Sequence, residues 1–187
     1  MPADTDIIYR VNAADEICFT NRQYDEFAKA NDGGAALSTA VLHRSLWDFI
    51  TEPRTRQLYR EVLRRVRSGR SIQFTFRCDS PACRRLLEMV VVAAEDQCVE
   101  FRTSIVSQES RPPQTVLQHR ARSSGDLLRI CAWCNAVDLD GNWVELEEVA
   151  IRLRLFEHAC LPELTHGICE ACFAKMKGTL SDPPSAG

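Results

Sequence analysis

The 187-residue sequence contains no long hydrophobic run. A helix that crosses a membrane needs about 18 or more consecutive apolar residues, and polar or charged residues interrupt every stretch before it reaches that length. The first ten residues, MPADTDIIYR, also lack the basic start and apolar stretch of an export signal. We therefore expect a cytoplasmic protein that does not enter a membrane.

The sequence also lacks the short motifs of several common enzyme classes. It has no glycine-rich phosphate loop, no GxSxG turn for a serine nucleophile, no HExxH zinc-protease motif and no protein-kinase signature. Glu147 and Glu148 are adjacent, so on a helix their side chains point about 100° apart and do not form a carboxylate pair. We expect no enzymatic activity.

The nine cysteines do not fit a disulfide framework, because their number is odd and no export signal precedes them. We expect reduced thiols. The remaining composition, with 45% hydrophobic and 26% charged residues, is typical of a soluble globular protein. The length allows one ordinary domain and one small domain.

Residues 1–108 begin with the pattern of a hairpin followed by a short helix. Apolar runs at 7–11 and 17–21 flank a polar turn, as two paired strands would. Asn21 is placed to cap a helix over residues 22–31, in which apolar side chains recur at helical spacing.

The clearest helix covers residues 53–69. Thr51 is the expected N-terminal cap, Pro53 suits the first turn, and Gly69 suits the end. Apolar residues at helical spacing predict its buried stripe, which consists of Leu58, Val62 and Val66.

Three further apolar stretches, at 71–76, 84–94 and 97–108, are rich in β-branched residues and predict antiparallel strands. The expected order is two strands, helical segments and three strands. Residues 1–108 are therefore predicted to form an α+β domain, an antiparallel sheet with flanking helices.

The remainder is predicted to be a linker, a second domain and a tail. Residues 109–125 contain Pro-Pro and many polar residues, which indicates a linker. Residues 126–177 form the expected cysteine-rich domain, and residues 178–187 form a flexible tail.

Within the cysteine-rich domain, Asp140-Gly141 predicts the turn of a hairpin. A helix is expected from about Glu145 to His158, and residues 161–178, LPELTHGICEACFAKMKG, are expected to be a loop that leads into a last short helix. The side chains predicted to face inward from the helix over 145–158 are Leu146, Val149, Leu153 and Phe156.

Two Cys-x-x-Cys pairs mark this domain as a metal-binding segment. Each pair lets a tight turn aim two thiolates at one point, and two such turns complete a tetrahedron around a zinc ion. His166 is an alternative ligand that could replace one cysteine or orient a thiolate. The expected fold is a small treble-clef or zinc-ribbon-like domain, and the expected ligands are Cys131, Cys134, Cys169 and Cys172.

Other uses of these cysteines stay open. An iron-sulfur cluster takes the same four thiolates, and the cluster could serve as a redox-responsive or metal-responsive switch. A thioredoxin-like redox site is a further alternative, although neither pair has the βαβ setting of that motif. Four unrelated buried thiols would require two coincidences of spacing. Covalent haem attachment is excluded, because neither pair is followed by histidine.

Charge argues against nucleic-acid binding by this domain. Residues 126–177 contain nine acidic and five basic residues, and zinc held by four thiolates would add two further negative charges. Phosphate backbones attract clustered lysine and arginine instead. We expect protein partners rather than nucleic acid.

Two stretches of the first domain resemble the PAS family. Residues 17–31, ICFTNRQYDEFAKAN, resemble its second strand and first helix, and residues 42–59, LHRSLWDFITEPRTRQLY, resemble its middle helices. Together with the closing strands, the resemblance covers about residues 6–108. It implies a sensory domain with a small-molecule cavity or a dimerisation face, through which a homodimer could form.

The resemblance does not name a PAS ligand, which stays unknown. The asparagine-cysteine-arginine motif of the photoreactive flavin branch is absent. His43, the only histidine of the domain, is expected at the surface or in a cap rather than as a haem ligand. It also stands where the family often has glycine, which leaves the local turn open.

The second domain resembles a small cysteine-rich segment of bacterial signalling proteins, which often lies beside PAS domains. The stretches that carry this resemblance are CAWCNAV, GNWVELEE and LTHGICEAC, within about residues 129–173. Both resemblances together imply a sensory or adaptor protein of bacterial signal transduction.

Overall fold

The computed structural model describes residues 5–117, 123–157 and 160–181. No helix among them is long and apolar enough to span a membrane. The contacts between residues divide the chain into two compact units. The first comprises residues 1–75, 88–105 and 174–187 and the second 76–87 and 106–173, each as far as these residues are described.

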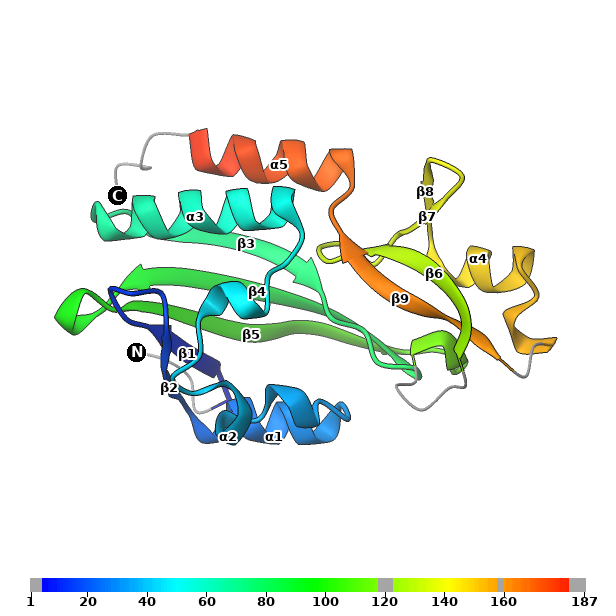
Figure 1. The fold of residues 1–187 in the computed structure, drawn as a ribbon, viewed down its shortest axis with the longest axis horizontal. Helices are drawn as coiled ribbons and strands as arrows, with labels where there is room; N and C mark the ends of the chain where they lie inside the picture. The colour runs from blue at the N-terminus through cyan, green and yellow to red at the C-terminus, as the bar shows by residue number, and fades with distance from the viewer. Residues whose placement is uncertain (1–4, 118–122, 158–159, 182–187) are drawn as a thin grey trace. The chain divides into compact units, whose positions relative to one another are not determined.

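A five-stranded sheet has the strand order β2-β1-β5-β4-β3 (Figure 1). Two strands precede the helical segments from α1 to α3 and three strands follow them, so the predicted α+β order is confirmed. The strands are β1 (Ile7–Val11), β2 (Ile17–Thr20), β3 (Ile72–Arg77), β4 (Cys83–Ala93) and β5 (Val99–Ser110). The helical segments are α1 (Arg22–Ala30), η1 (Gly34–Ala36), α2 (Ser38–Val41), η2 (Leu46–Asp48), α3 (Pro53–Arg67) and η3 (Glu95–Gln97).

The first helix begins where the sequence predicts. The Asn21 side-chain oxygen accepts hydrogen bonds from the backbone N–H groups of Tyr24 and Ile8, both at 3.0 Å. One amide therefore caps α1 and also ties it to β1.

The long helix α3 is capped one residue later than predicted. Glu52, not Thr51, is the N-cap, and its carboxylate accepts from the backbone N–H of Thr55 at 2.6 Å. Pro53 then takes the first helical position, where a missing N–H costs nothing. The predicted buried stripe is confirmed, since Leu58, Val62 and Val66 are each at most 3% exposed.

His43 has a φ of +64° and an exposed side chain. Its backbone N–H donates to the Ile17 carbonyl at 2.8 Å, which fixes this left-handed turn beside β2. Glycine adopts such a φ most readily. The sequence resemblance places a frequent glycine of the PAS family at this position, and the backbone conformation of His43 is one that suits glycine.

A second sheet has the order β8-β7-β6-β9. Its strands are β6 (Ser123–Cys131), β7 (Val137–Leu139), β8 (Asn142–Val144) and β9 (Leu161–Gly167). The helical segments of this region are η4 (Thr115–Leu117), α4 (Leu146–Arg152), η5 (Leu155–Glu157) and α5 (Glu170–Ser181). The predicted turn at Asp140-Gly141 is confirmed, and both residues have positive φ, as a tight hairpin turn requires.

The sequence predicts that the stretch 161–178 begins as a loop, and this part of the prediction is wrong, because residues 161–167 form β9. This strand pairs in parallel with β6, and Cys131 lies opposite Gly167. Parallel partners are joined by a long crossover, so the partner of β9 lies far back in the sequence and no local hairpin signal announces it.

Three element ends also differ from the sequence predictions. β5 extends to Ser110 and β6 begins at Ser123, so strands enter both ends of the predicted linker; residues 118–122 lie outside the described residues. α5 continues to Ser181 in the predicted tail, whose residues 182–187 are likewise not described.

The helix predicted over 145–158 ends early. α4 stops at Arg152, and Arg154 has a φ of +50°, which breaks the helix before η5. Leu153 is therefore 37% exposed rather than buried, whereas Leu146 and Val149 are fully buried as predicted. Residues 158 and 159 lie outside the described part.

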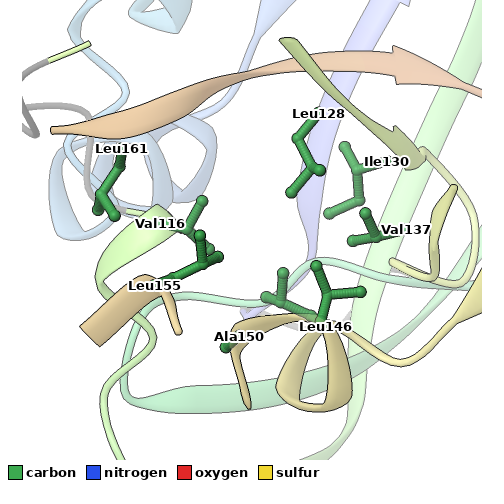
Figure 2. Close-up of a cluster of buried hydrophobic side chains, with 9 residues drawn as sticks. Val116, Leu128, Ile130, Val137, Leu146, Ala150, Leu155 and Leu161 are labelled. Atoms are coloured by element: carbon green, nitrogen blue, oxygen red, sulfur yellow. The ribbon is translucent and has the colours of Figure 1, made fainter. Parts of the chain in front are cut away.

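The second unit has its own hydrophobic core (Figure 2). Val116 of η4 belongs to it and is 6% exposed, so part of the predicted linker packs into this core. The cluster consists of Val116, Leu128, Ile130, Val137, Leu146, Val149, Ala150, Leu155 and Leu161.

Candidate metal centre

The first cysteine pair is held by a tight turn at the end of β6. Cys131 is the last residue of the strand, and its N–H donates to the Ala136 carbonyl at 2.7 Å. The N–H of Asn135 donates back to the Cys131 carbonyl at 2.9 Å, and Asn135 takes a φ of +58°. This turn lets Cys134 fold back toward Cys131.

The second pair lies at the start of α5. Cys169 immediately precedes the helix and Cys172 lies in its first turn. The N–H of Cys172 donates to the Cys169 sulfur, and the N–H of Cys169 donates to the Cys131 sulfur, both at 3.4 Å. The second of these hydrogen bonds favours the negatively charged thiolate form of the Cys131 sulfur and so lowers its pKa.

The structure brings the four predicted cysteines together. Their Sγ atoms all lie within 4.8 Å of one another, and those of Cys134 and Cys169 are 3.9 Å apart. Zinc–sulfur bonds of ~2.3 Å in a tetrahedron place the sulfurs ~3.8 Å apart. The cluster therefore fits a tetrahedral ion and could hold a metal.

The thiols of the cluster strongly affect one another's protonation. Hydrogen bonds from Cys134 and Cys172 hold the pKa of Cys131 well below its usual value. The same contact with Cys131 raises the pKa of Cys134 to about 11, and it also raises the pKa of Cys172. A bound divalent cation would displace the thiol protons, since coordinating thiols are deprotonated.

His166 is not brought into the cluster. It lies on β9 opposite Ile130 of β6, and its side chain is exposed. Among the described residues, the group whose ligand atoms converge consists of the four cysteines alone. Four thiolates fill a tetrahedral sphere and leave no open position for a reacting water.

The backbone beside the second pair is packed tightly against an arginine. A Cβ on Gly167 would come within 2.4 Å of the Arg129 Nε. The Arg129 guanidinium stacks over the Trp143 ring at 5.3 Å, and the Trp143 Nε1 donates to Glu170 at 3.0 Å. Gly167 therefore gives this side chain the room it needs at the end of β9.

A buried ion-pair network in the second unit was not predicted from the sequence. Asp79 has no exposed side-chain surface and pairs with Arg77 at 2.5 Å and Arg111 at 3.1 Å. Arg111 also pairs with Glu147 at 2.7 Å. These partners are separated by up to 36 residues, so no local spacing identifies them. The one sequence signal is the cluster of charged residues in and beside the β3–β4 connection, which are Arg77, Asp79, Arg84 and Arg85.

In the first unit, a hollow of about 350 Å³ is lined in part by Arg10, Glu100 and Arg102. Both arginines pair with Glu100, at 2.7 Å and 2.5 Å. Although partial burial opposes ionisation of Glu100, these hydrogen bonds lower its pKa. The two guanidinium groups already neutralise a carboxylate, so the hollow defines no ligand.

Comparison with known proteins gives likenesses only to solved structures. No family model matches the sequence, and no curated protein matches it. The PAS domain of an HTR-like protein from Haloarcula marismortui is 15% identical, with a TM-score of 0.36 over 55% of this chain and 88% of that one.

Two further neighbours come from Vibrio. A sensory box sensor histidine kinase from Vibrio cholerae is 12% identical, with a TM-score of 0.39 over 56% of this chain and 84% of that one. The PAS domain of nitrogen regulation protein NR(II) from Vibrio parahaemolyticus is 12% identical, with a TM-score of 0.32 over 55% and 91%. All three TM-scores lie below 0.5, so these likenesses carry no further argument.

Proposed function

We propose that the protein is a sensory or adaptor protein of bacterial signal transduction. It would combine a PAS-like domain with a structural zinc site and act through partner proteins, without catalysis of its own. The observation that carries the metal site is the convergence of four cysteine sulfurs within 4.8 Å.

The strand order supports the PAS-like part of the proposal. The helical segments from α1 to α3 lie between β2 and β3, and the three later strands form the other part of the same antiparallel sheet. This is the arrangement that the sequence resemblance implies. The resemblance further implies sensing of a small molecule, or dimerisation, as the task of this domain.

The turn at the end of β6, the β7–β8 hairpin and the start of α5 support a treble-clef-like site. Two ligands come from the turn and two from the start of the helix. Zinc suits this donor set because it prefers four tetrahedral sulfurs in structural sites. An iron-sulfur cluster takes the same donors, and its visible absorption would distinguish it.

Protein partners fit the charge of the region better than nucleic acid does. The excess of acidic residues over 126–177 would repel a phosphate backbone. Four thiolates around a divalent ion would increase this repulsion.

Native and denaturing mass spectrometry of the purified protein tests the proposal. We expect one zinc ion per chain in the native spectrum and its loss on denaturation. The same spectrum reports subunit number and any retained small molecule. A chain that binds no metal when zinc is supplied during purification would contradict the structural-zinc proposal.

A second candidate function is a redox-responsive or metal-responsive switch. Cys134 and Cys172 are partly exposed residues, whereas Cys131 and Cys169 are buried, so solvent reaches the edge of the cluster at two of its four cysteines. Release of zinc by dilute hydrogen peroxide and rebinding after thiol reduction would favour this function. Retention of zinc under the same treatment would favour the purely structural role.

A further inference from the structure

We propose that metal binding at the four-cysteine cluster is coupled to the order of residues 77–85, which join β3 to β4. The inference rests on the proposed metal site. It adds that binding or loss of the metal changes the order of residues at the end of β3 and the start of β4, two strands of the five-stranded sheet. All the contacts that carry it lie within the second unit.

The most direct contact is a backbone hydrogen bond. Trp133 lies between the two cysteines of the first pair, and its carbonyl accepts from the N–H of Arg77 at 2.7 Å. Arg77 is the last residue of β3. The turn that the metal would hold rigid therefore supplies the hydrogen-bond partner for the end of a strand.

The Arg77 side chain extends this connection to α4. Its guanidinium pairs with Asp79 at 2.5 Å and with Glu145, the N-cap residue of α4, at 2.8 Å. Asp79 also accepts from the backbone N–H of Arg85 at 3.1 Å. One buried carboxylate thus joins the two sides of the β3–β4 connection.

Arg111 completes the network, and its side chain is only 5% exposed. It pairs with Asp79 and Glu147, and it donates to the Ser80 carbonyl at 3.0 Å. Buried charges are costly when one partner is lost, because the remaining charge stays desolvated without compensation. The network therefore favours a state in which all its members are in place.

Coupling between these contacts and the metal must act in both directions. Metal binding rigidifies the turn over 131–134 and so favours the Arg77–Trp133 hydrogen bond. By linkage, contacts that hold residues 77–85 in place must raise the affinity of the cluster for metal by the same factor. A charge-neutralising substitution far from the sulfurs should therefore weaken zinc binding.

Hydrogen exchange measured by mass spectrometry tests the first direction. Removal of zinc by a chelator should increase exchange in peptides covering residues 77–85 as well as in those covering 126–173. Peptides covering β1 and β2, residues 7–20, serve as the internal control and should not change. Zinc loss that leaves exchange of 77–85 unchanged would overturn the proposal.

Zinc affinity, measured by competition with a chromophoric chelator, tests the reverse direction. Asp79→Asn should weaken zinc binding by at least about 5-fold, the lower end of typical coupling between sites. Glu61→Gln is the matched control, because Glu61 also pairs with two arginines but lies on α3. It should leave zinc affinity unchanged.

Glu147→Gln provides a milder test if Asp79→Asn does not fold, since the Glu147 side chain is 26% exposed. If a folded Asp79→Asn or Glu147→Gln variant binds zinc with the same affinity as the wild type, the proposed coupling is overturned, although the proposed metal site still stands. Absence of zinc from the wild type would instead contradict the proposed metal site, so the two failures are distinguishable.

Discussion

Single residues in this protein have roles that depend on very local geometry. Gly167 does not have positive φ, so its value lies in its small size rather than in backbone freedom. It stands opposite Cys131 in the β6–β9 pairing, two residues before the second cysteine pair. Any side chain here must displace Arg129.

Gly167→Ala should therefore destabilise the protein by about 1 kcal/mol, because Arg129 must leave its stacked position over Trp143. Urea unfolding measures the change. Gly178→Ala is the control, since a Cβ there meets nothing within 4 Å. It should be neutral or stabilising, because alanine is the better helix former. Equal effects of the two substitutions would contradict the packing explanation.

Glu61 provides a pH-dependent contribution on α3. Hydrogen bonds from Arg64 and then Arg65 lower the pKa of its carboxyl from 4.5 to about 2. A depressed pKa in the folded state means that the contribution is present above pH 4.5 and is lost as the pH falls toward 2.

The expected contribution is below about 1 kcal/mol, because the Glu61 side chain is 32% exposed and solvent screens the pairs. The difference in unfolding free energy between wild type and Glu61→Gln should shrink between about pH 6 and pH 3.5. Urea titrations at both pH values measure it. A difference that stays constant would show that Glu61 acts through packing.

At the scale of elements, α4 shows how one helix separates buried from exposed positions. Leu146 is fully buried in the core of the second unit (Figure 2), whereas Ile151 is 70% exposed on the same seven-residue helix. The short helix is stable because its apolar face packs, since isolated helices of this length are marginal.

Leu146→Ala should cost about 2–5 kcal/mol, through lost burial and the cavity that remains. Ile151→Ala should change stability by less than about 0.5 kcal/mol, because its side chain is largely in solvent. Chemical denaturation of both variants gives the comparison. A comparable loss for Ile151→Ala would indicate that a partner or another copy covers this face.

The elements that the sequence predicts well are those whose signals are local. Asn21 precedes its helix, Asp140-Gly141 forms its own hairpin turn, and each cysteine pair fits within one turn. β9 was missed because its parallel partner lies about a full crossover away in the sequence. The Asp79–Arg111 pair was missed for the same reason, since nothing near either residue identifies the other.

At the scale of the molecule, the predicted separation into a sheet domain, a linker and a cysteine-rich domain differs from the two units of the structure. Residues 76–87, which comprise the end of β3, the connection and the start of β4, belong by their contacts to the unit that contains the cysteines. A sequence pattern can place a domain boundary only between segments that follow one another along the chain. The two units of the structure are defined by contacts, and each combines segments that are distant in the sequence.

Loss of one cluster cysteine should affect a whole unit. Cys169→Ser should abolish stoichiometric zinc and lower the melting temperature, because a small segment with a limited core depends on its metal. Cys160→Ser is the matched control, since Cys160 is exposed and outside the cluster. It should change neither quantity. Full zinc content in Cys169→Ser would contradict four-sulfur coordination.

The parallel pairing of β6 with β9 also determines when this region can form during synthesis. A nascent chain that has emerged only as far as Gly167 carries two of the four sulfurs and none of α5. An ion that requires all four can be captured only after Cys172 has left the ribosome. Chains that stop at Gly167 would contain both strands of the β6–β9 pair but would leave Cys131 and Cys134 without the other two sulfurs of the cluster.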